Sequence, residues 1–595
     1  MKILINSLVL FGGIIGQTIA RSVKFSVISF GNDVKLNIGG NLTPMAKSDP
    51  TIPLWSATVD VPDSDINYFY VQDLQNDVQR TLKAGATTTY NELIGREITE
   101  YDMVEFTYPD EPAWGRSIGK TKLFDDSYIP TFIISGYGNF FVEGVGSTTF
   151  SRVIVILKDE VFSFNNIPTS GKNDDEDKFQ FKITLPEDGI YNRNVLKFRP
   201  SSYDPVFFRQ ILYGDILHAI GNPAHESVTC RVYLDNGVGI GLYVLQEDCT
   251  TESFIRSAFY GDPSTGTIKP YTPSVIYDCS TGADFNVNDP NWLGSFQNNT
   301  YDIKAELLEM TRQLDILDVN NEEEVKSFSE NWLDLDTLFK ALALEYLAGH
   351  WDSYWFLTTN FVTYHPSEET EGGTGYYSKY KYYFIDQDFD QTWGVGMAQQ
   401  LDPSTFPTRS YKDFVGLDWA NLNPDEEFDS DTRVVIDKLI GCGVADKNAN
   451  CYSKSLFEKH LKKIVRYIFN PTALGNKIDA YKDRLRPEII WDTEEITRLH
   501  AGKIQKFHFN INDFDNNINS GNYQGSVNPW GLKDWVATRA DVVCNEFNID
   551  FNEASLTDSN GNTVITTSDG IKITPNIVSK FIYLLITTFA LLYIF

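Results

Sequence analysis

The segment Lys381–Gly394 reads KYYFIDQDFDQTWG and places Asp386, Asp388 and Asp390 at alternate positions inside an aromatic run. Burying a carboxylate is costly unless a cation neutralises it, and carboxylate oxygens are preferred ligands of magnesium and calcium. The segment is therefore either a strand that emerges at an exposed edge or a metal-binding site.

The segment before these aspartates contains further polar residues, and their order matches the one used in phosphoryl transfer. The helical pattern LALEYLAGHWD ends at Asp352, Asn360 follows, and the turn-rich insert PSEETEGGTG leads to the aspartates. In phosphoryl transfer one aspartate orients or deprotonates the attacking hydroxyl, while an asparagine and a second aspartate hold magnesium at the nucleotide phosphates. Protein kinases use H-R-D-x4-N and D-F-G for these tasks, and HWD and DFD stand in the corresponding places here.

Bulk properties set the class of protein. The chain has 595 residues, of which 42% are hydrophobic and 14% aromatic, so we expect a folded protein. Its length suggests either roughly three to four units of ordinary size or one large catalytic body with a smaller companion. The formal charge of −31 argues against a nucleic-acid partner, because phosphate binding needs a basic surface. An acidic surface suits a secreted protein or one that works with metal ions.

The hydrophobic periodicity predicts an α+β protein with two domains. Short runs of alternating residues over 21–160 indicate a β-sandwich, and the charged loop 170–178 marks a boundary. Strand patterns and then mainly helical patterns fill a larger domain over 178–550. The stretch SGYGNFFVEGVGS, followed by Lys158, imitates a glycine-rich loop with a strand lysine, but we interpret it as turns of the first domain.

Both ends of the chain carry targeting signals. Residues 1–20 have one lysine, an apolar run and small residues before Ala20, the layout of a secretory signal peptide. A stalk over 551–570, small residues at Ser568 and an apolar tail within 571–595 form the signal for a glycosylphosphatidylinositol (GPI) anchor, with a tail-anchoring helix as the alternative. We expect a secreted protein held by a lipid at the plasma membrane or cell wall.

Cysteines and sequons agree with that route. Six cysteines in a secreted chain predict disulfides. Two of them flank a hairpin and two could close a short loop, which would leave the last two for each other, although six cysteines allow 15 pairings. The candidates are Cys230 with Cys249, Cys442 with Cys451, and Cys279 with Cys544. Asn41 and Asn298 stand in N-glycosylation sequons.

Five segments in order resemble the spore-coat protein H (CotH) kinase family, an atypical protein-kinase-like group, and in particular its surface-anchored fungal (Mucorales-type) invasins. They are VLKFRPSSYDPVFFRQILYGDILHAIGNPAHESVTCRVYLDNGVGIGLYVLQED, SFIRSAFYGDP, LALEYLAGHWDSYW, KYYFIDQDFDQTWG and WVATRADVVCNEFNI, within about 179–549. The resemblance implies a kinase-like domain over 178–550 that uses ATP with Mg²⁺ or Mn²⁺ to phosphorylate Ser and Thr hydroxyls of proteins. It also implies host-cell surface receptors as partners and a place at the cell surface or in a spore coat.

Residue roles follow from the same resemblance. Asp352 would be the catalytic base, and Asp388 would bind magnesium with Asp390 as a second acid. Asn360 would be a further metal ligand, although it lies eight residues after Asp352 where the kinase pattern has five. Asp386 has no place in the pattern, and we interpret it as a solvated neighbour.

The cationic side of the site is carried over in the same way. Lys197 in LKFR would bind the nucleotide phosphates, and Arg209 on the following helix would support it. Glu247, at the end of the hairpin, would pair with one of these two cations.

Two other functions compete with a kinase. A non-enzymatic adhesin could use the same body as a scaffold, and an exposed apolar patch or a tyrosine-rich loop such as YSKYKYY would favour it. A glycoside hydrolase would need two acids facing each other across an open groove with no lysine nearby.

Overall fold

The computed structural model describes most of the chain between Ala20 and Ile573. The residues outside the description are 1–19, 145, 174–175, 280–281, 289–291, 299–304, 372–378, 423–431, 501, 503–507, 522, 524–527, 552–555, 558–562, 567–571 and 574–595. The predicted signal peptide up to residue 19, Ser568 and nearly all of the predicted anchor segment lie outside the described residues. Within the described part, no helix has the length and apolarity needed to cross a membrane.

The chain divides into two compact units. The first contains the described residues up to Thr99 together with Lys158–Glu160, and the second contains Glu100–Leu157 and the residues from Val161 onward. The sequence pattern placed this boundary near residue 160. The structure places it earlier because the strands between residues 131 and 156 pair with later strands of the second unit.

The first unit consists of two β-sheets around one core. One sheet has the order β4-β5-β1-β9 and the other β3-β2-β6-β7, with β8 also paired to β6. Alternate residues of β1, namely Val23, Phe25 and Val27, are buried and meet Tyr68 and Tyr70 of the second sheet. The bounds are β1 Ala20–Ile28, β2 Val34–Ile38, β3 Asn41–Pro44, β4 Ala46–Lys47, β5 Leu54–Pro62, β6 Ile66–Gln72, β7 Gln75–Asn76, β8 Arg80–Leu82 and β9 Thr88–Leu93.

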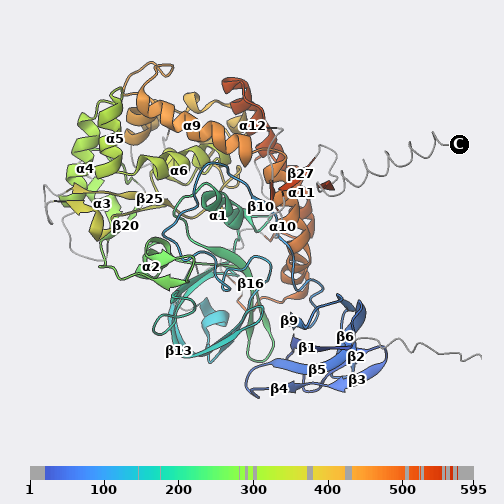
Figure 1. The fold of residues 1–595 in the computed structure, drawn as a ribbon. Coiled ribbons are helices and arrows are strands. Elements are labelled where there is room, and N and C mark those ends of the chain that lie inside the picture. The colour runs from blue at the N-terminus through green and yellow to red at the C-terminus, as the bar shows by residue number, and fades with distance from the viewer. Residues whose placement is uncertain are drawn as a thin grey trace, which may run out of the picture. The chain divides into compact units, whose positions relative to one another are not determined.

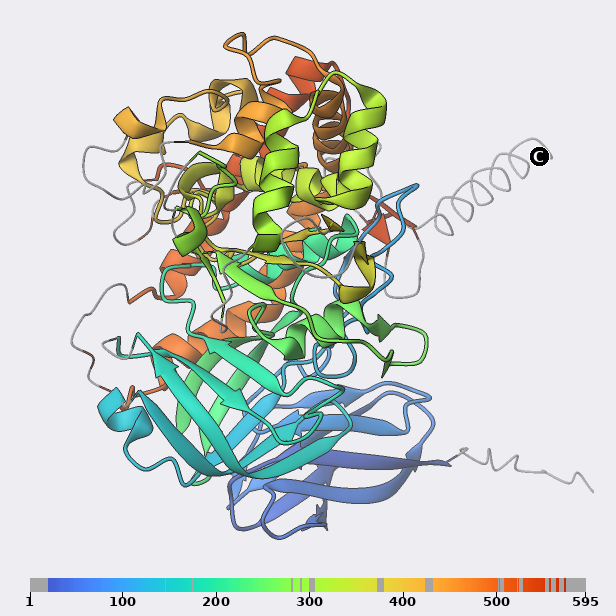
Figure 2. The same ribbon diagram turned by 90° about the vertical axis from the view of Figure 1, so that its left-hand side faces the viewer.

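The second unit begins with a closed barrel of seven strands, drawn in teal and green in Figure 2. Its order is β11-β12-β13-β14-β15-β17-β16, and parallel pairing of β11 with β16 closes it. Phe181 and Phe198 stack inside the barrel with ring centroids 4.4 Å apart. The bounds are β11 Thr131–Ser135, β12 Ser147–Ile156, β13 Val161–Lys172, β14 Gln180–Thr184, β15 Val195–Arg199, β16 Ser227–Leu234 and β17 Gly239–Gln246.

The glycine-rich stretch before Lys158 contributes to the barrel core. Phe140 and Phe141 lie in a one-turn helix, η1 (Phe140–Gly144), and pack against the aromatic residues inside the barrel. The Lys158 ammonium lies over the Tyr90 ring, 4.7 Å from its centroid, in the first unit. The stretch therefore fills space and makes turns rather than a phosphate loop, but it does so in the second unit.

Helices and a small sheet complete the second unit. Helix α1 contacts both β16 and α6 and so lies between the barrel and the helical part (Figure 1). The sheet has the order β21-β20-β22-β25, and α6 packs against β25. The chain is thus α+β, as the sequence predicts.

The bounds of these helices are α1 Arg209–Ala219, α2 Glu252–Phe259, α3 Trp292–Ser295, α4 Ala305–Ile316, α5 Glu322–Asn331, α6 Leu335–Ala348, α7 Tyr354–Leu357, α8 Trp419–Leu422, α9 Tyr452–Tyr467, α10 Ala473–Ile490, α11 Ile511–Asn519 and α12 Leu532–Phe547. The strands of the sheet are β20 Ile276–Cys279, β21 Phe296–Gln297, β22 Phe361–Tyr364 and β25 Tyr383–Asp386. Short strands are β10 Glu105–Phe106, β18 Gly261–Asp262, β19 Thr267–Ile268, β23 Thr370–Glu371, β24 Lys379–Tyr380, β26 Leu556–Thr557, β27 Thr563–Thr566 and β28 Lys572–Ile573.

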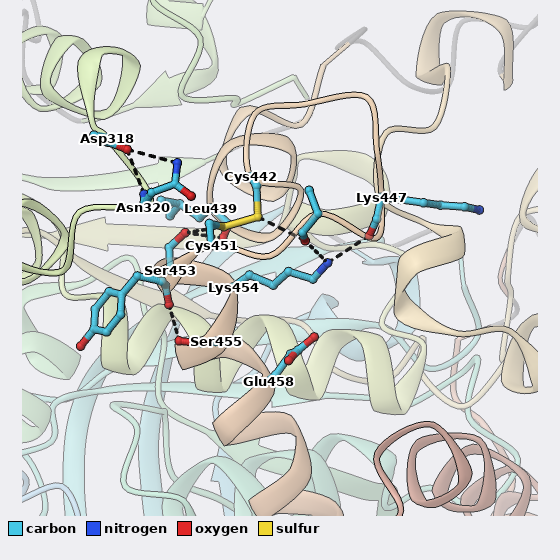
Figure 3. The surroundings of a disulfide bond; sticks show 12 residues. Asp318, Asn320, Leu439, Cys442, Lys447, Cys451, Ser453, Lys454, Ser455 and Glu458 are labelled. Carbon is cyan, nitrogen blue, oxygen red and sulfur yellow. Dashed lines mark hydrogen bonds between the residues drawn. A yellow bond between two sulfur atoms is a disulfide. The ribbon is translucent and has the colours of Figure 1, made fainter.

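One predicted disulfide is present. Cys442 and Cys451 are bonded with their Cα atoms 5.8 Å apart, at the entrance to α9 (Figure 3). Beside it, the Lys454 ammonium donates to the carbonyls of Lys447 and Ala449 at 3.0 and 2.8 Å, and the hydroxyl of Ser453 donates to the carbonyl of Leu439 at 2.7 Å. The bond and these contacts fix the loop that precedes α9.

The other two predicted pairings are wrong. Cys230, Cys249, Cys279 and Cys544 form no disulfide among the residues that the structure describes. The hairpin register places Tyr243, not Cys249, opposite Cys230, whose side chain belongs to the barrel core. A sequence shows that two cysteines flank a hairpin but not which residues its register brings together.

The two glycosylation candidates differ in their surroundings. Asn41 is exposed at the start of β3. Asn298 is half-buried, and the two residues that complete its sequon lie outside the described part of the chain.

The disulfide yields a stability prediction. Because the bond closes a loop of sequence separation 9, its removal in the Cys442→Ser/Cys451→Ser variant should lower the free energy of unfolding by about 2–3 kcal/mol. Urea denaturation followed by tryptophan fluorescence measures this loss. The half-buried Cys544 serves as the control, since Cys544→Ser removes a thiol but no bond. Equal stability of the double variant and this control would contradict the role of the disulfide.

Candidate functional site

The end of helix α6 positions Asp352. The helix begins at its N-cap Asp334, whose carboxylate accepts a hydrogen bond from the Thr337 amide, and it ends at Gly349. Gly349 has φ +59°, and a Cβ there would lie 2.4 Å from the Trp535 ring, so the chain can turn at this point only because the residue is glycine. The turn directs His350 and Asp352 out of the helix toward the hairpin formed by β22 and β25.

That hairpin brings the other predicted residues to Asp352. Phe361 of β22 pairs with Asp386 of β25. Asn360, just before β22, and Asp388, just after β25, therefore lie at the same end of the two strands. The side-chain amide of Asn360 donates to the main-chain carbonyl of Asp352 at 3.0 Å. Three residues that the sequence separates by up to 36 positions therefore lie together.

Arg199 of β15 binds both acids of the DFD step, and the sequence analysis missed it. Its guanidinium contacts Asp388 through one nitrogen and Asp390 through the other, at 2.9 Å to Asp390. Arg199 is two residues after Lys197 in LKFR, so the two side chains share one face of β15, away from the barrel-facing Phe198. That spacing was the signal that could have identified Arg199.

Lys197, Asn360 and Asp388 line one polar cavity of about 390 Å³. Arg199 and Lys197 hold the pKa of Asp388 well below its usual range although burial opposes this, so Asp388 is ionised. Desolvation and the charge of Arg199 lower the pKa of Lys197. The cavity thus contains an anionic oxygen ligand and a cationic amine.

More charges surround the same cavity. Lys172 and Lys182 are further cations in its wall, and Asp248 and Asp278 are further acids. The Lys182 ammonium lies 3.1 Å from Asp248, and Lys197 and Lys182 lower the pKa of Asp248 against the effect of burial. Three lysines near one pocket offer a setting for an anionic group such as a chain of phosphates.

Asp352 has the protonation behaviour of a general base that works near neutral pH. Burial and the charge of Asp388 raise the pKa of Asp352 to about 6. A base is most effective when its pKa is near the operating pH, because it is then both ionised and able to take a proton. Asp352 is half-buried and its carboxylate is not engaged by Arg199.

The donor set fits a magnesium ion that arrives with a nucleotide. Asp388 and Asn360 each present an oxygen-bearing side chain to the cavity. Mg²⁺ is usually held by one or two carboxylates, with waters and substrate phosphates completing its six ligands. No group of three His, Cys, Asp or Glu side chains that could hold a metal by itself occurs in the described part of the chain.

Arg209 and Glu247 do not line the polar cavity, and Asp390 is less accessible to a metal ion than predicted. Arg209 binds Asp204 at 2.5 Å and Asn517 at 2.7 Å, so it stabilises the start of α1 instead of supporting Lys197. Glu247 pairs with Arg193 at 2.7 Å and not with Lys197 or Arg209. Asp390 is buried, and Arg199 engages one of its oxygens.

The interpretation of Asp386 as a solvated neighbour is wrong. Its side chain is 1% exposed. The Tyr213 hydroxyl donates to one carboxylate oxygen at 2.6 Å, and Nδ1 of His350 lies 3.4 Å from the other. His350 in turn donates from Nε2 to the Asp388 carbonyl at 3.1 Å. Asp386 is thus the buried counter-ion of the histidine that contacts the Asp388 main chain.

Comparison with known proteins gives a match over most of the chain. The family model described as CotH kinase protein matches residues 171–543, which is more than half of the 595 residues. The chain is 28% identical to Invasin CotH3 of Rhizopus delemar over 90% of this chain and 86% of that protein. It is 28% identical to Invasin CotH2 of the same organism, over 89% and 84% of the two chains. It is also 28% identical to Spore coat protein homolog 1, again from Rhizopus delemar, over 88% and 82%.

Arg199 should be important for stability. Arg199→Ala leaves two neighbouring carboxylates without their cation, so we expect the free energy of unfolding to fall by about 3–5 kcal/mol. The control is Lys182→Ala, which removes a cation with a 39% exposed side chain from its pair with Asp248 and should cost at most about 1 kcal/mol. Urea denaturation compares the two, and equal losses would contradict the proposed role of Arg199.

The buried histidine predicts a pH dependence of stability. Although burial opposes protonation, Asp386 raises the pKa of His350 to about 9 from its ordinary 6.5. The folded protein therefore retains a proton that the unfolded chain loses, and this contribution is complete below pH 6.5 and is lost as the pH rises through 9. Burial and Asp386 also raise the pKa of Glu345 to about 8, which acts in the same direction.

We expect His350 alone to lower the free energy of unfolding on the order of 3 kcal/mol between about pH 6.5 and 9, and Glu345 to add to this fall. Urea denaturation at a series of pH values measures the fall. In His350→Gln it should be clearly smaller. A wild-type slope in His350→Gln would show that the histidine is not the source.

Proposed function

The chain belongs to the CotH kinase protein family, and we propose that it is an atypical protein kinase that transfers phosphate from ATP to Ser and Thr hydroxyls of proteins at the cell surface or in a spore coat. The observation that carries the proposal is the meeting of Lys197, Asn360 and Asp388 in one polar cavity. Asp352 does not line this cavity, but its main chain is bonded to Asn360 and the charge of Asp388 helps to raise its pKa. The anionic and cationic groups match the two needs of phosphoryl transfer, which are metal binding and phosphate binding.

Each residue has a chemical role in this proposal. Bound Mg²⁺ or Mn²⁺ would neutralise charge on the nucleotide phosphates. Asp388 and Asn360 would hold that ion, and Lys197, assisted by Lys172 and Lys182, would bind phosphate oxygens. Asp352 would orient the acceptor hydroxyl and accept its proton. Arg199 keeps Asp388 ionised and in place.

A second cavity offers room for the remainder of the nucleotide. It has a volume of about 670 Å³ and shares Thr250 and Asp278 with the polar cavity. Its wall contains apolar side chains, including Ile255 and Val275, together with the ring of Tyr271. Such a lining suits a planar base better than a phosphate.

Adhesion is the second candidate function, and it is compatible with the first. Two of the similar proteins are named invasins and a third is named a spore coat protein homolog. We propose a cell-surface location with a GPI anchor near Ser568, an N-glycan at the exposed Asn41, and host-cell surface receptors as partners. Asn298 lines the second cavity, so a glycan at this sequon would exclude a nucleotide base from it. The hydrolase alternative is disfavoured, because Lys197 shares the cavity with the acids.

The kinase proposal predicts the behaviour of three proteins in one assay. Wild type should incorporate labelled phosphate with ATP and Mg²⁺ or Mn²⁺, and its rate should fall about tenfold per pH unit below pH 6 as Asp352 becomes protonated. Asp352→Asn and Asp388→Asn should each reduce the rate by at least about 10²-fold. Equal incorporation of labelled phosphate by all three proteins would contradict the roles assigned to Asp352 and Asp388.

The same variants separate catalysis from adhesion. If Asp352→Asn binds host cells as well as wild type but transfers no phosphate, the two functions use different surfaces. If wild type transfers no phosphate and still binds cells, the chain is an adhesin on a kinase-like scaffold.

A further inference from the structure

A chain of buried polar groups runs from the DFD step to the loop after β17. The main-chain N–H of Phe389 donates to Oε1 of Gln210 at 2.8 Å. Nε2 of Gln210 lies 3.0 Å from Nε2 of His225, and Nδ1 of His225 lies 3.2 Å from Sγ of Cys249. Gln210 and His225 are fully buried and Cys249 is 3% exposed, so water does not compete for these contacts.

The first contact sets the direction of all the others. Because Oε1 of Gln210 accepts from Phe389, the other end of the amide is NH₂ and donates to Nε2 of His225. Nε2 must then lack a proton, so the neutral ring carries its proton on Nδ1 and donates to Cys249. Burial and the charge of Lys197 lower the pKa of His225 to about 3, which agrees with a neutral ring.

The relay joins two segments that line the same cavity. At one end Phe389 follows Asp388, and at the other Cys249 stands between Asp248 and Thr250. Asp388, Asp248 and Thr250 line the polar cavity. The His225 ring also stacks on the Phe389 ring with centroids 4.8 Å apart and an interplanar angle of 15°. Glu247 pairs with Arg193 and Arg209 pairs with Asp204, so neither of these charged groups takes part in the relay.

We propose that Gln210, His225 and Cys249 act as positioning residues. They hold the main chain of Phe389, and with it Asp388, in a fixed position relative to Asp248 and Thr250 on the other side of the cavity. The consequence for nucleotide binding rests on the proposed function. The positional link itself does not, and it can be measured in the protein without any ligand.

The informative variant is His225→Phe. It keeps an aromatic ring to stack on Phe389 but removes both nitrogens, and it does not alter the group that binds the Phe389 amide. The variant loses both contacts of His225, and loss of the one that holds Gln210 should speed hydrogen–deuterium exchange at the Phe389 amide about threefold to tenfold. It should also weaken binding of Mn²⁺·ATP, measured by calorimetry, by a similar factor. Gln210→Leu should produce a larger change of both quantities in the same direction.

His460→Phe is the matched control. His460 is buried as well, but it pairs with Asp336 at 3.1 Å and belongs to α9. It should leave both the Phe389 exchange rate and the Mn²⁺·ATP affinity at the wild-type value, even if its melting temperature falls as much as that of His225→Phe. This comparison separates positioning from general destabilisation.

The outcomes are distinguishable. Unchanged exchange at Phe389 in His225→Phe overturns the relay, whether or not the protein binds nucleotide. Faster exchange with unchanged Mn²⁺·ATP affinity overturns its role in the site. Faster exchange in a protein that binds no Mn²⁺·ATP even as wild type supports the positional link and refutes the proposed kinase function instead.

Discussion

The ion pairs of Arg199 are the interaction on which the site depends. Asp388 and Asp390 are separated by one residue, and two carboxylates so close together cannot both be ionised in a protein interior without a cation between them. Arg199 binds both through different nitrogens of one rigid guanidinium. Because Arg199 belongs to β15, this pairing requires one face of the barrel to lie against the β22–β25 hairpin. The cavity lined by Lys197, Asn360 and Asp388 exists where these two parts meet.

The sequence identified the polar groups of the site better than their partners. The order of Asp352, Asn360 and Asp388 followed from a helix end and a strand pattern, whereas Lys197 came from the resemblance to the CotH kinase family. The partners of Glu247 and Asp386 were not predictable, because tertiary packing brings Arg193 and Tyr213 close to them. Asp204, the partner of Arg209, lies only five residues before it, and this local pair was overlooked. Arg199 was overlooked although it shares a strand face with Lys197. Periodicity indicates the face of a side chain, whereas only the folded chain shows which carboxylate it meets.

The fold shows the same division between local and non-local information. The alternation of β1 and β6 and the α+β class could be predicted, since both depend on local patterns. The domain boundary could not, because β11 and β12 are local hairpin strands whose membership in the barrel is decided by the parallel pairing of β11 with β16, about one hundred residues later. The disulfides divide similarly. Cys442 and Cys451 close a short loop, while the fate of Cys230 depends on a hairpin register.

The peptide group between Asp388 and Phe389 is held from both of its ends. Its carbonyl accepts from His350, which is backed by Asp386, and its N–H donates to Gln210, which is backed by His225. Asp388 has φ +65°, a conformation that costs a non-glycine residue of order 1 kcal/mol or more. Two buried hydrogen bonds on one peptide plane can sustain that cost and fix the direction in which the Asp388 carboxylate leaves the main chain. The two side chains that bind this peptide group come from different elements, His350 from the end of α6 and Gln210 from the start of α1. A change in the packing of either helix would therefore reach Asp388 through its own main chain, without any contact between that helix and the carboxylate.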